Sequence, residues 1–255
     1  MARAMVQATL PHRQVPGNEF SRSNGNYTLS ILAPSAVGLP YGSIPRLMLA
    51  WISTEAVKTK CREIELGDSL SGFMRQLDMV PTGGRWGSVT RLKQQTKRLF
   101  SSTISATYDG GNQYALMNQP LAEQAIFWWD AKKPDQAALW KSTVTLSDRF
   151  YREIIDRPVP IDMRAIKALK KSPMALDAYT WLSYRVSYLK NPTVIPWKAL
   201  SLQFGSNYAQ LRDFRIAFLK EVQKVQTVYK GINFDTSAEG LILKPSLTHV
   251  GKRLK

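Results

Sequence analysis

Two rows of cationic and amide side chains recur at helical spacing along the chain. The first row, within 85–105, includes Arg91 and Arg98, and this stretch contains no acidic residue. The second row, within 208–229, includes Arg212 and Arg215. Arg and Lys neutralise phosphate, and Arg and Gln can make paired hydrogen bonds to the edges of guanine and adenine. The chemistry that these rows predict is therefore the binding of a nucleic acid.

The candidate DNA-contacting residues are taken from these two rows and the positions beside them. Asn207 is also typical of a helix cap. In the first helix we expect Trp86, Val89, Leu92, Thr96 and Leu99 to be buried, which leaves Ser88, Arg91, Gln95 and Arg98 exposed. The full set is Arg85, Ser88, Arg91, Gln94, Gln95, Lys97, Arg98, Asn207, Arg212, Arg215, Lys220, Lys224 and Lys230.

Catalytic chemistry has little support in the sequence. The only histidines are His12 and His249, both in expected tails, and Cys61 is the only cysteine. There is no Walker phosphate-binding loop, and no His-x-His motif accompanies a tyrosine as a nicking enzyme would require. We therefore expect neither an enzyme nor a metal site nor a cofactor. A lone cysteine excludes an internal disulfide and is typical of a protein of a reducing cytoplasm.

The net charge of +16 over 255 residues makes a polyanion the expected partner. An anionic membrane surface is the competing partner. No run approaches the 18 or more apolar residues that a spanning helix needs, and the apolar stripes are continuous as in a domain core. Double-stranded DNA is therefore favoured over a membrane.

The order of elements around each row is the same. An amphipathic helix is followed by a short extended stretch, a short helix, a Gly-containing turn, a long basic helix and strands. This order predicts an α+β protein with tandem winged-helix domains. We expect a flexible N-terminal arm over 1–26, a first domain over 27–158 and a second over 159–255 with a basic C-terminal tail. The runs 102–109, 121–130 and 138–147 are expected to form a β-meander that serves as the first wing.

Three stretches carry a resemblance to a known family. They are LPYGSIPRLMLAWISTEAVKTKCREIELGDSLSGFMRQLD (39–78), TGGRWGSVTRLKQQTKRLFSSTIS (82–105) and LSDRFYREIIDRPVPIDMRAIKALKKSPMALDAYTWLSYRV (146–186). They resemble the RepA-type replication initiators of broad-host-range bacterial plasmids. The family motifs fall on Arg85, Arg91, Lys97 and Arg98.

The resemblance implies binding to direct repeats (iterons) at a plasmid origin, opening of adjacent A+T-rich DNA and recruitment of host initiator and helicase-loading proteins. It also implies an equilibrium between homodimers and monomers, in the bacterial cytoplasm. We expect self-association through the β-meander of the first domain or its flanking elements. It favours the second domain as the main reader of sequence. Two alternatives remain: a winged-helix repressor that binds its own operator, and a DNA-nicking initiator.

Overall fold

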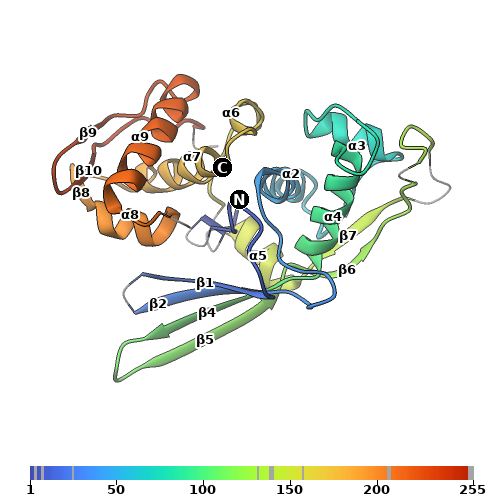
Figure 1. Cartoon of the computed structure of the whole chain (residues 1–255), viewed down its shortest axis with the longest axis horizontal. Coiled ribbons are helices and arrows are strands. Elements are labelled where there is room, and N and C mark those ends of the chain that lie inside the picture. Colours follow the sequence, from blue (N-terminus) through green and yellow to red (C-terminus); the bar gives the residue numbers. More distant parts are fainter. Residues whose placement is uncertain are drawn as a thin grey trace.

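The computed structural model describes residues 1–2, 5–6, 9–24, 26–130, 132–137, 141–156, 158–205 and 208–251. The fold is α+β. Two helical units lie side by side, and a sheet of long strands projects from between them (Figure 1). The described N-terminal residues lie in the middle of the molecule, next to both units (Figure 1).

The first unit, on the right in Figure 1, combines helices with a small antiparallel sheet. The sheet has the order β3-β7-β6, so its first strand pairs with its last. The helix α5 (Asp148–Asp156) follows the sheet. In chain order the elements are α2 (Ser43–Thr59), β3 (Glu63–Glu65), α3 (Leu70–Gln76), α4 (Ser88–Phe100), β6 (Ala122–Ile126) and β7 (Thr143–Leu146).

The second unit repeats this order of elements and this strand order. Its sheet is β8-β10-β9, again with the first strand paired with the last. The helix α6 (Met163–Leu169) precedes the unit. The elements are α7 (Pro173–Val186), β8 (Thr193–Pro196), α8 (Trp197–Phe204), α9 (Leu211–Val228), β9 (Phe234–Thr236) and β10 (Gly240–Leu243).

A third sheet corrects the expected β-meander. It has the order β1-β2-β4-β5 and consists of two antiparallel hairpins, β1 (Glu19–Asn24) with β2 (Tyr27–Leu32) and β4 (Thr103–Asp109) with β5 (Tyr114–Pro120). The run 102–109 therefore pairs with β2 and β5, whereas β6 and β7 pair with each other. The expected wing of three consecutive strands is wrong, because the strand that follows α4 pairs across more than 70 residues of chain.

The helices form where apolar spacing and capping residues agree. In α4, Val89, Leu92 and Leu99 are fully buried on one face, as the 3.6-residue period predicts. The helix α7 begins with Ser172 as its N-cap, whose side chain accepts a hydrogen bond from the Ala175 amide, and with Pro173 in the first turn. Residues on every face of α7 are buried, so this helix lies at the centre of the molecule.

The N-terminal segment also differs from the expectation. Residues 1–26 were expected to form a flexible arm because Gly, Ser and Pro are frequent and no period is evident. In the structure Met5, Val6 and Leu10 are buried in the core, and 19–24 form β1. The Val159 amide donates to the Met1 carbonyl (2.8 Å), and Thr9 Oγ1 donates to the Gln203 carbonyl (3.0 Å). Apolar side chains do not need regular spacing to be buried, and the apolar area that this segment buries stabilises its position on the core.

Candidate nucleic-acid interface

The helix α4 presents a short cationic face to solvent. Arg91, Gln94 and Lys97 are exposed at successive helical turns, and Lys93 beside them donates to the Trp129 carbonyl (3.2 Å). Arg85 is exposed in the turn before the helix, with its guanidinium 5.0 Å from the ring centroid of Trp86. These side chains can reach phosphate oxygens and base edges without any rearrangement of the core.

Two residues of the predicted exposed row are instead buried. Ser88 is 6% exposed, accepts a hydrogen bond from the Thr82 amide (2.8 Å) and donates to the Val80 carbonyl (2.6 Å). Gln95 is 5% exposed, and its Oε1 accepts from the Tyr41 amide (2.9 Å). Both side chains satisfy backbone groups of neighbouring segments, so the expectation that they are exposed is wrong.

Arg98 and Trp86 also lie differently from the expectation. Arg98 is half-buried, donates to the Leu39 carbonyl (3.1 Å) and lies 5.3 Å from the ring centroid of Tyr41. Trp86 was expected in the buried stripe but is 79% exposed, because it precedes the first residue of α4 and so does not share the helix period. The surface at the start of α4 therefore presents the cationic Arg85 beside the exposed ring of Trp86.

The helix α9 presents the second cationic row. Its buried face consists of Phe214, Phe218, Val222 and Val225, while Leu211, expected to be buried, is 47% exposed at the first position of the helix. The helix begins at 211 and not at 208 as predicted, which explains this difference. Its exposed cations and the one that follows it are Arg212, Lys220, Lys224 and Lys230.

The two cations nearest the start of α9 have different surroundings. The Arg212 side chain is 77% exposed, and its Nε donates to Asp213 (3.4 Å). Arg215 is half-buried with its guanidinium 5.0 Å from the ring centroid of Trp197, so it is held against the start of α8. Asn207, the remaining candidate, lies outside the described residues.

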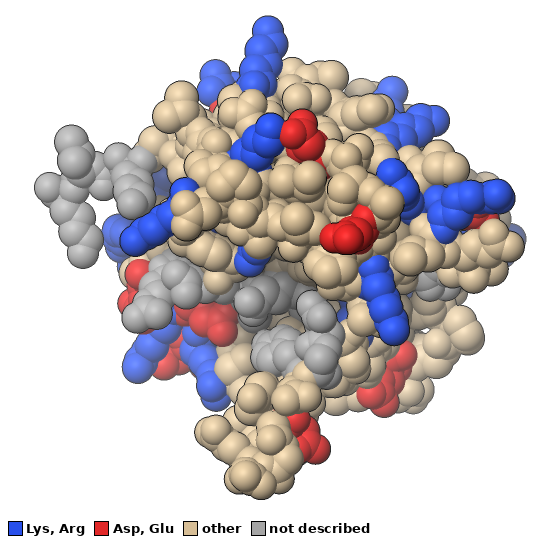
Figure 2. All heavy atoms as spheres, turned by 90° about the vertical axis from the view of Figure 1, so that its left-hand side faces the viewer, with Lys and Arg blue, Asp and Glu red and all other residues tan. Residues whose placement is uncertain are grey.

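Charge is spread over the face of the second unit that Figure 2 shows. Figure 2 shows Lys and Arg at several places on this face, with Asp and Glu among them. Within α9 the acidic residues are paired: Lys224 Nζ donates to Glu221 (2.7 Å), as Arg212 does to Asp213. The excess of Lys and Arg over Asp and Glu, 35 against 19, nevertheless leaves the whole molecule cationic.

A buried ion pair joins the two units. Arg46 in α2 donates to both carboxylate oxygens of Asp177 in α7, at 2.7 and 2.8 Å, and the two side chains are 4% and 8% exposed. The remaining donors of Arg46 bond the carbonyls of Leu10, Pro11 and Gly42. Lys170, after α6, also pairs with Asp78, after α3. These contacts join α2 to α7, and the end of α6 to the residues after α3.

His12 and Arg22 extend the cluster around Asp177. His12 Nε2 lies 2.8 Å from Asp177 Oδ2. Burial lowers the pKa of His12 below its ordinary value, although Asp177 opposes this shift. Burial acts to raise the pKa of Asp177, but Arg46 and His12 together hold that pKa below its usual range. Burial also lowers the pKa of Arg22, on β1, to about 10.

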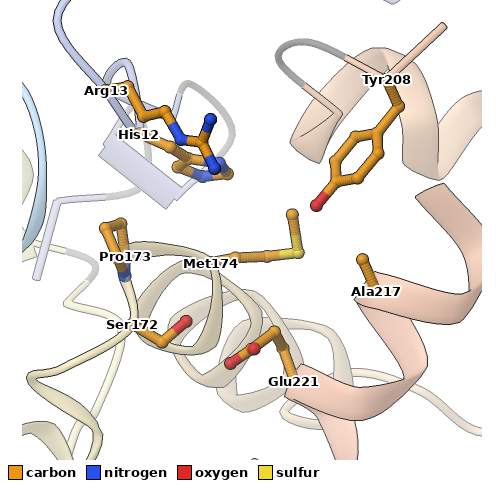
Figure 3. Close-up of a pocket in the computed structure, with 8 residues that line it drawn as sticks. All are labelled: His12, Arg13, Ser172, Pro173, Met174, Tyr208, Ala217 and Glu221. Carbon is orange, nitrogen blue, oxygen red and sulfur yellow. The ribbon is translucent and has the colours of Figure 1, made fainter. Parts of the chain in front are cut away.

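The N-terminal segment closes a cavity between α7 and α9. His12 and Arg13 lie on one side of this cavity, Ser172 and Met174 at the start of α7 on the second, and Tyr208 and Glu221 on the third (Figure 3). The cavity measures roughly 240 Å³. Met174 reaches into its middle, and cationic and acidic groups both line it (Figure 3).

Several residues that matter to this arrangement escaped the sequence interpretation. Arg46, Asp177 and His12 lie far apart in the chain, and no local pattern distinguishes them. Lys93 carried a usable signal, since it follows Arg91 on the same acid-free helix. In the part of the chain that the structure describes, no group of three or more His, Cys, Asp or Glu could hold a metal ion. None of the described helices is long and apolar enough to span a membrane.

The comparisons with known proteins agree with this architecture. The family described as plasmid encoded RepA protein matches residues 39–198. A crystal structure of domains 2 and 3 of RctB, from selenomethionine derivatives, superposes with a TM-score of 0.63 at 8% identity and covers 96% of each chain. A second structure of RctB domains 2–3 has a TM-score of 0.60 at 10% identity and covers 94% of this chain and 96% of that one.

At such identities the RctB structures show that the fold is shared. No curated protein sequence matches this chain. The family match covers more than half of the chain and includes the ion pair between α2 and α7, the whole of α4, and α7. The chain therefore belongs to the family of plasmid-encoded RepA proteins, the replication initiators that its sequence resembles.

Proposed function

We propose that this protein initiates plasmid replication by binding double-stranded DNA at the origin through two winged-helix domains. The observation that carries the proposal is the repeated unit: helix, strand, short helix, longer helix, strand, strand, with the first strand paired to the last in both copies and with β4 and β5 inserted before the last two strands of the first copy. In winged-helix domains the long helix of such a unit enters the major groove. Here α4 and α9 occupy that position.

The side chains on the two long helices support the proposal. The outward face of α4 carries Arg91, Gln94 and Lys97, and that of α9 carries Arg212 and Lys220. Cations of this kind bond phosphates, while Arg and Gln can also bond base edges. The buried pair between Arg46 and Asp177 joins α2 to α7, one helix from each unit, and this supports contact of both units with one continuous site.

The family membership extends the proposal to the origin itself. Two units that each contact about one turn of the duplex would cover roughly 20 base pairs, the length of a short direct repeat. We infer that the DNA is an iteron array, that binding promotes opening of neighbouring A+T-rich DNA, and that host replication proteins are recruited there. Binding alone is sufficient for this role, so no enzymatic step is proposed.

The test is DNA binding by purified protein. Footprinting on the DNA that flanks its coding region should reveal repeated protected sites, and Arg91→Ala and Arg212→Ala should each weaken binding to them. Arg152→Ala is the matched control, because its exposed guanidinium pairs with Asp148 on α5, outside both long helices. Equal losses in all three variants, or no protected repeat, would contradict the proposal.

The same assay separates the proposed role from the two alternatives. A repressor would protect one palindromic operator and leave neighbouring DNA double-stranded to permanganate. A nicking enzyme would convert supercoiled origin DNA to the open circle in the presence of Mg²⁺. We expect repeated sites, reactive thymines beside them, no strand breaks and unchanged binding in EDTA.

A further inference from the structure

An exposed isoleucine lies in the cationic row of α9. Ile216 is 63% exposed and does not belong to the partly buried apolar side chains that pack against the core. Arg212 lies one turn before it and Lys220 one turn after it, at four-residue spacing, so all three side chains share one face of the helix. This face therefore presents a branched alkyl group between two cations.

The acidic residues of α9 do not disrupt this row. Asp213 accepts a hydrogen bond from Arg212, and Glu221 accepts one from Lys224. One turn after Lys220 lie Gln223 and Lys224, which are both exposed and add no negative charge to this face. An anionic ligand on this face would therefore meet two cations at its edges and an alkyl group at its centre.

Duplex DNA in the major groove has a matching arrangement. Phosphates line both rims of the groove, and on the floor the base edges expose polar atoms and one apolar group, the C5-methyl of thymine. A helix in the groove directs the middle of such a row at the base edges, while cations one turn away on either side along the helix can reach the phosphates. A branched alkyl side chain at the centre has only the thymine methyl as an apolar partner.

Resting on the proposed function, we propose that Ile216 is a specificity-determining residue that recognises thymine by packing on its C5-methyl group. Arg212 and Lys220 hold the phosphates on either side. Because Arg215 is held against Trp197, Ile216 and not Arg215 occupies the centre of the face that α9 offers to DNA.

The experiment removes the contact between Ile216 and the thymine methyl group twice, first by changing the DNA and then by changing the protein. The probe is the duplex that footprinting identifies, prepared with thymine and, separately, with uracil in place of thymine, which deletes only the C5-methyl groups. Wild-type protein should bind the uracil duplex about fourfold more weakly, the equivalent of one buried methyl group. Ile216→Ala should bind both duplexes equally, and Ile216→Val should retain most of the difference.

The control is Leu202→Ala, which truncates an apolar side chain of comparable exposure (47%) on α8 and should leave the thymine preference unchanged. A full thymine preference in Ile216→Ala, or no preference in wild type, would overturn the inference while the footprint stands. A change of sedimentation in Ile216→Ala with the preference intact would overturn it in favour of a protein contact. Absence of any protected duplex would instead contradict the proposed function.

Discussion

Replacing Asp177 by Ala should destabilise the protein more than the loss of any exposed ion pair. The substitution leaves the Arg46 guanidinium, 4% exposed, with bonds to three carbonyls but without the carboxylate that receives two of its N–H groups. Removing one partner of a buried pair costs about 3–5 kcal/mol, because the remaining charge stays desolvated. The three carbonyl bonds to Leu10, Pro11 and Gly42 place the expected loss near the lower end of that range, about 3 kcal/mol.

The assay is urea denaturation at pH 7, followed by circular dichroism and by tryptophan fluorescence. The matched control is Glu123→Ala, which breaks the exposed pair with Arg62, where both side chains are more than 40% exposed; its loss should stay below about 1 kcal/mol. The double variant Arg46→Met with Asp177→Leu should recover most of the lost stability, since it removes both buried charges. If Asp177→Ala costs no more than Glu123→Ala, the two units are not held together by this pair.

Three further predictions concern pH, local structure and salt. Burial lowers the pKa of His12 in the folded state. The contribution of neutral His12 to stability should therefore be present above pH 6.5 and decline as the pH falls through the folded-state pKa. The variant His12→Gln should lack that decline in urea titrations over this range, and an unchanged decline would assign it to another group. Ser88→Ala should lower the free energy of unfolding by about 1–2 kcal/mol without changing DNA affinity measured under native conditions, because Ser88 bonds the backbone at Val80 and Thr82; a weakened affinity at unchanged stability would restore it as a contact residue. The logarithm of DNA affinity should fall linearly with the logarithm of salt concentration, by about 0.9 per phosphate neutralised, and a slope near zero in fluorescence anisotropy would refute the electrostatic contribution.

The sequence predicts those features that depend on local pattern. The buried positions Val89, Leu92 and Leu99 follow from the helical period, and the order of elements follows from turns and caps. The prediction that Ser88 and Gln95 are exposed is wrong because the helical period assigns polar residues to the solvent face. Whether a polar side chain is buried depends instead on a backbone group elsewhere in the chain that forms a hydrogen bond with it. For Gln95 that group is the Tyr41 amide, 54 residues earlier.

Pairing over long distances explains the other differences. The sequence predicts that 103–109 form a strand. Its partner β2 precedes α2 in the chain, and nothing in the sequence indicates that the two strands pair. The cluster of Arg46, Asp177 and His12 likewise joins residues that only the folded chain brings together. The assignment of DNA contacts to α4 and α9 stays a prediction until binding is measured.

If the protein binds DNA as proposed, the buried ion pair between the two units has a consequence for the spacing of the two half-sites. If the pair between Arg46 and Asp177 stays intact, α4 and α9 keep one distance and orientation. They can then enter the major groove together only when their half-sites lie on the same face of the duplex. Inserting five base pairs between the half-sites turns one of them by half a helical turn, whereas inserting ten restores the face but not the separation. Both insertions should therefore defeat simultaneous contact, and weakening the connection should make the protein tolerant of spacing before it loses its preference for sequence.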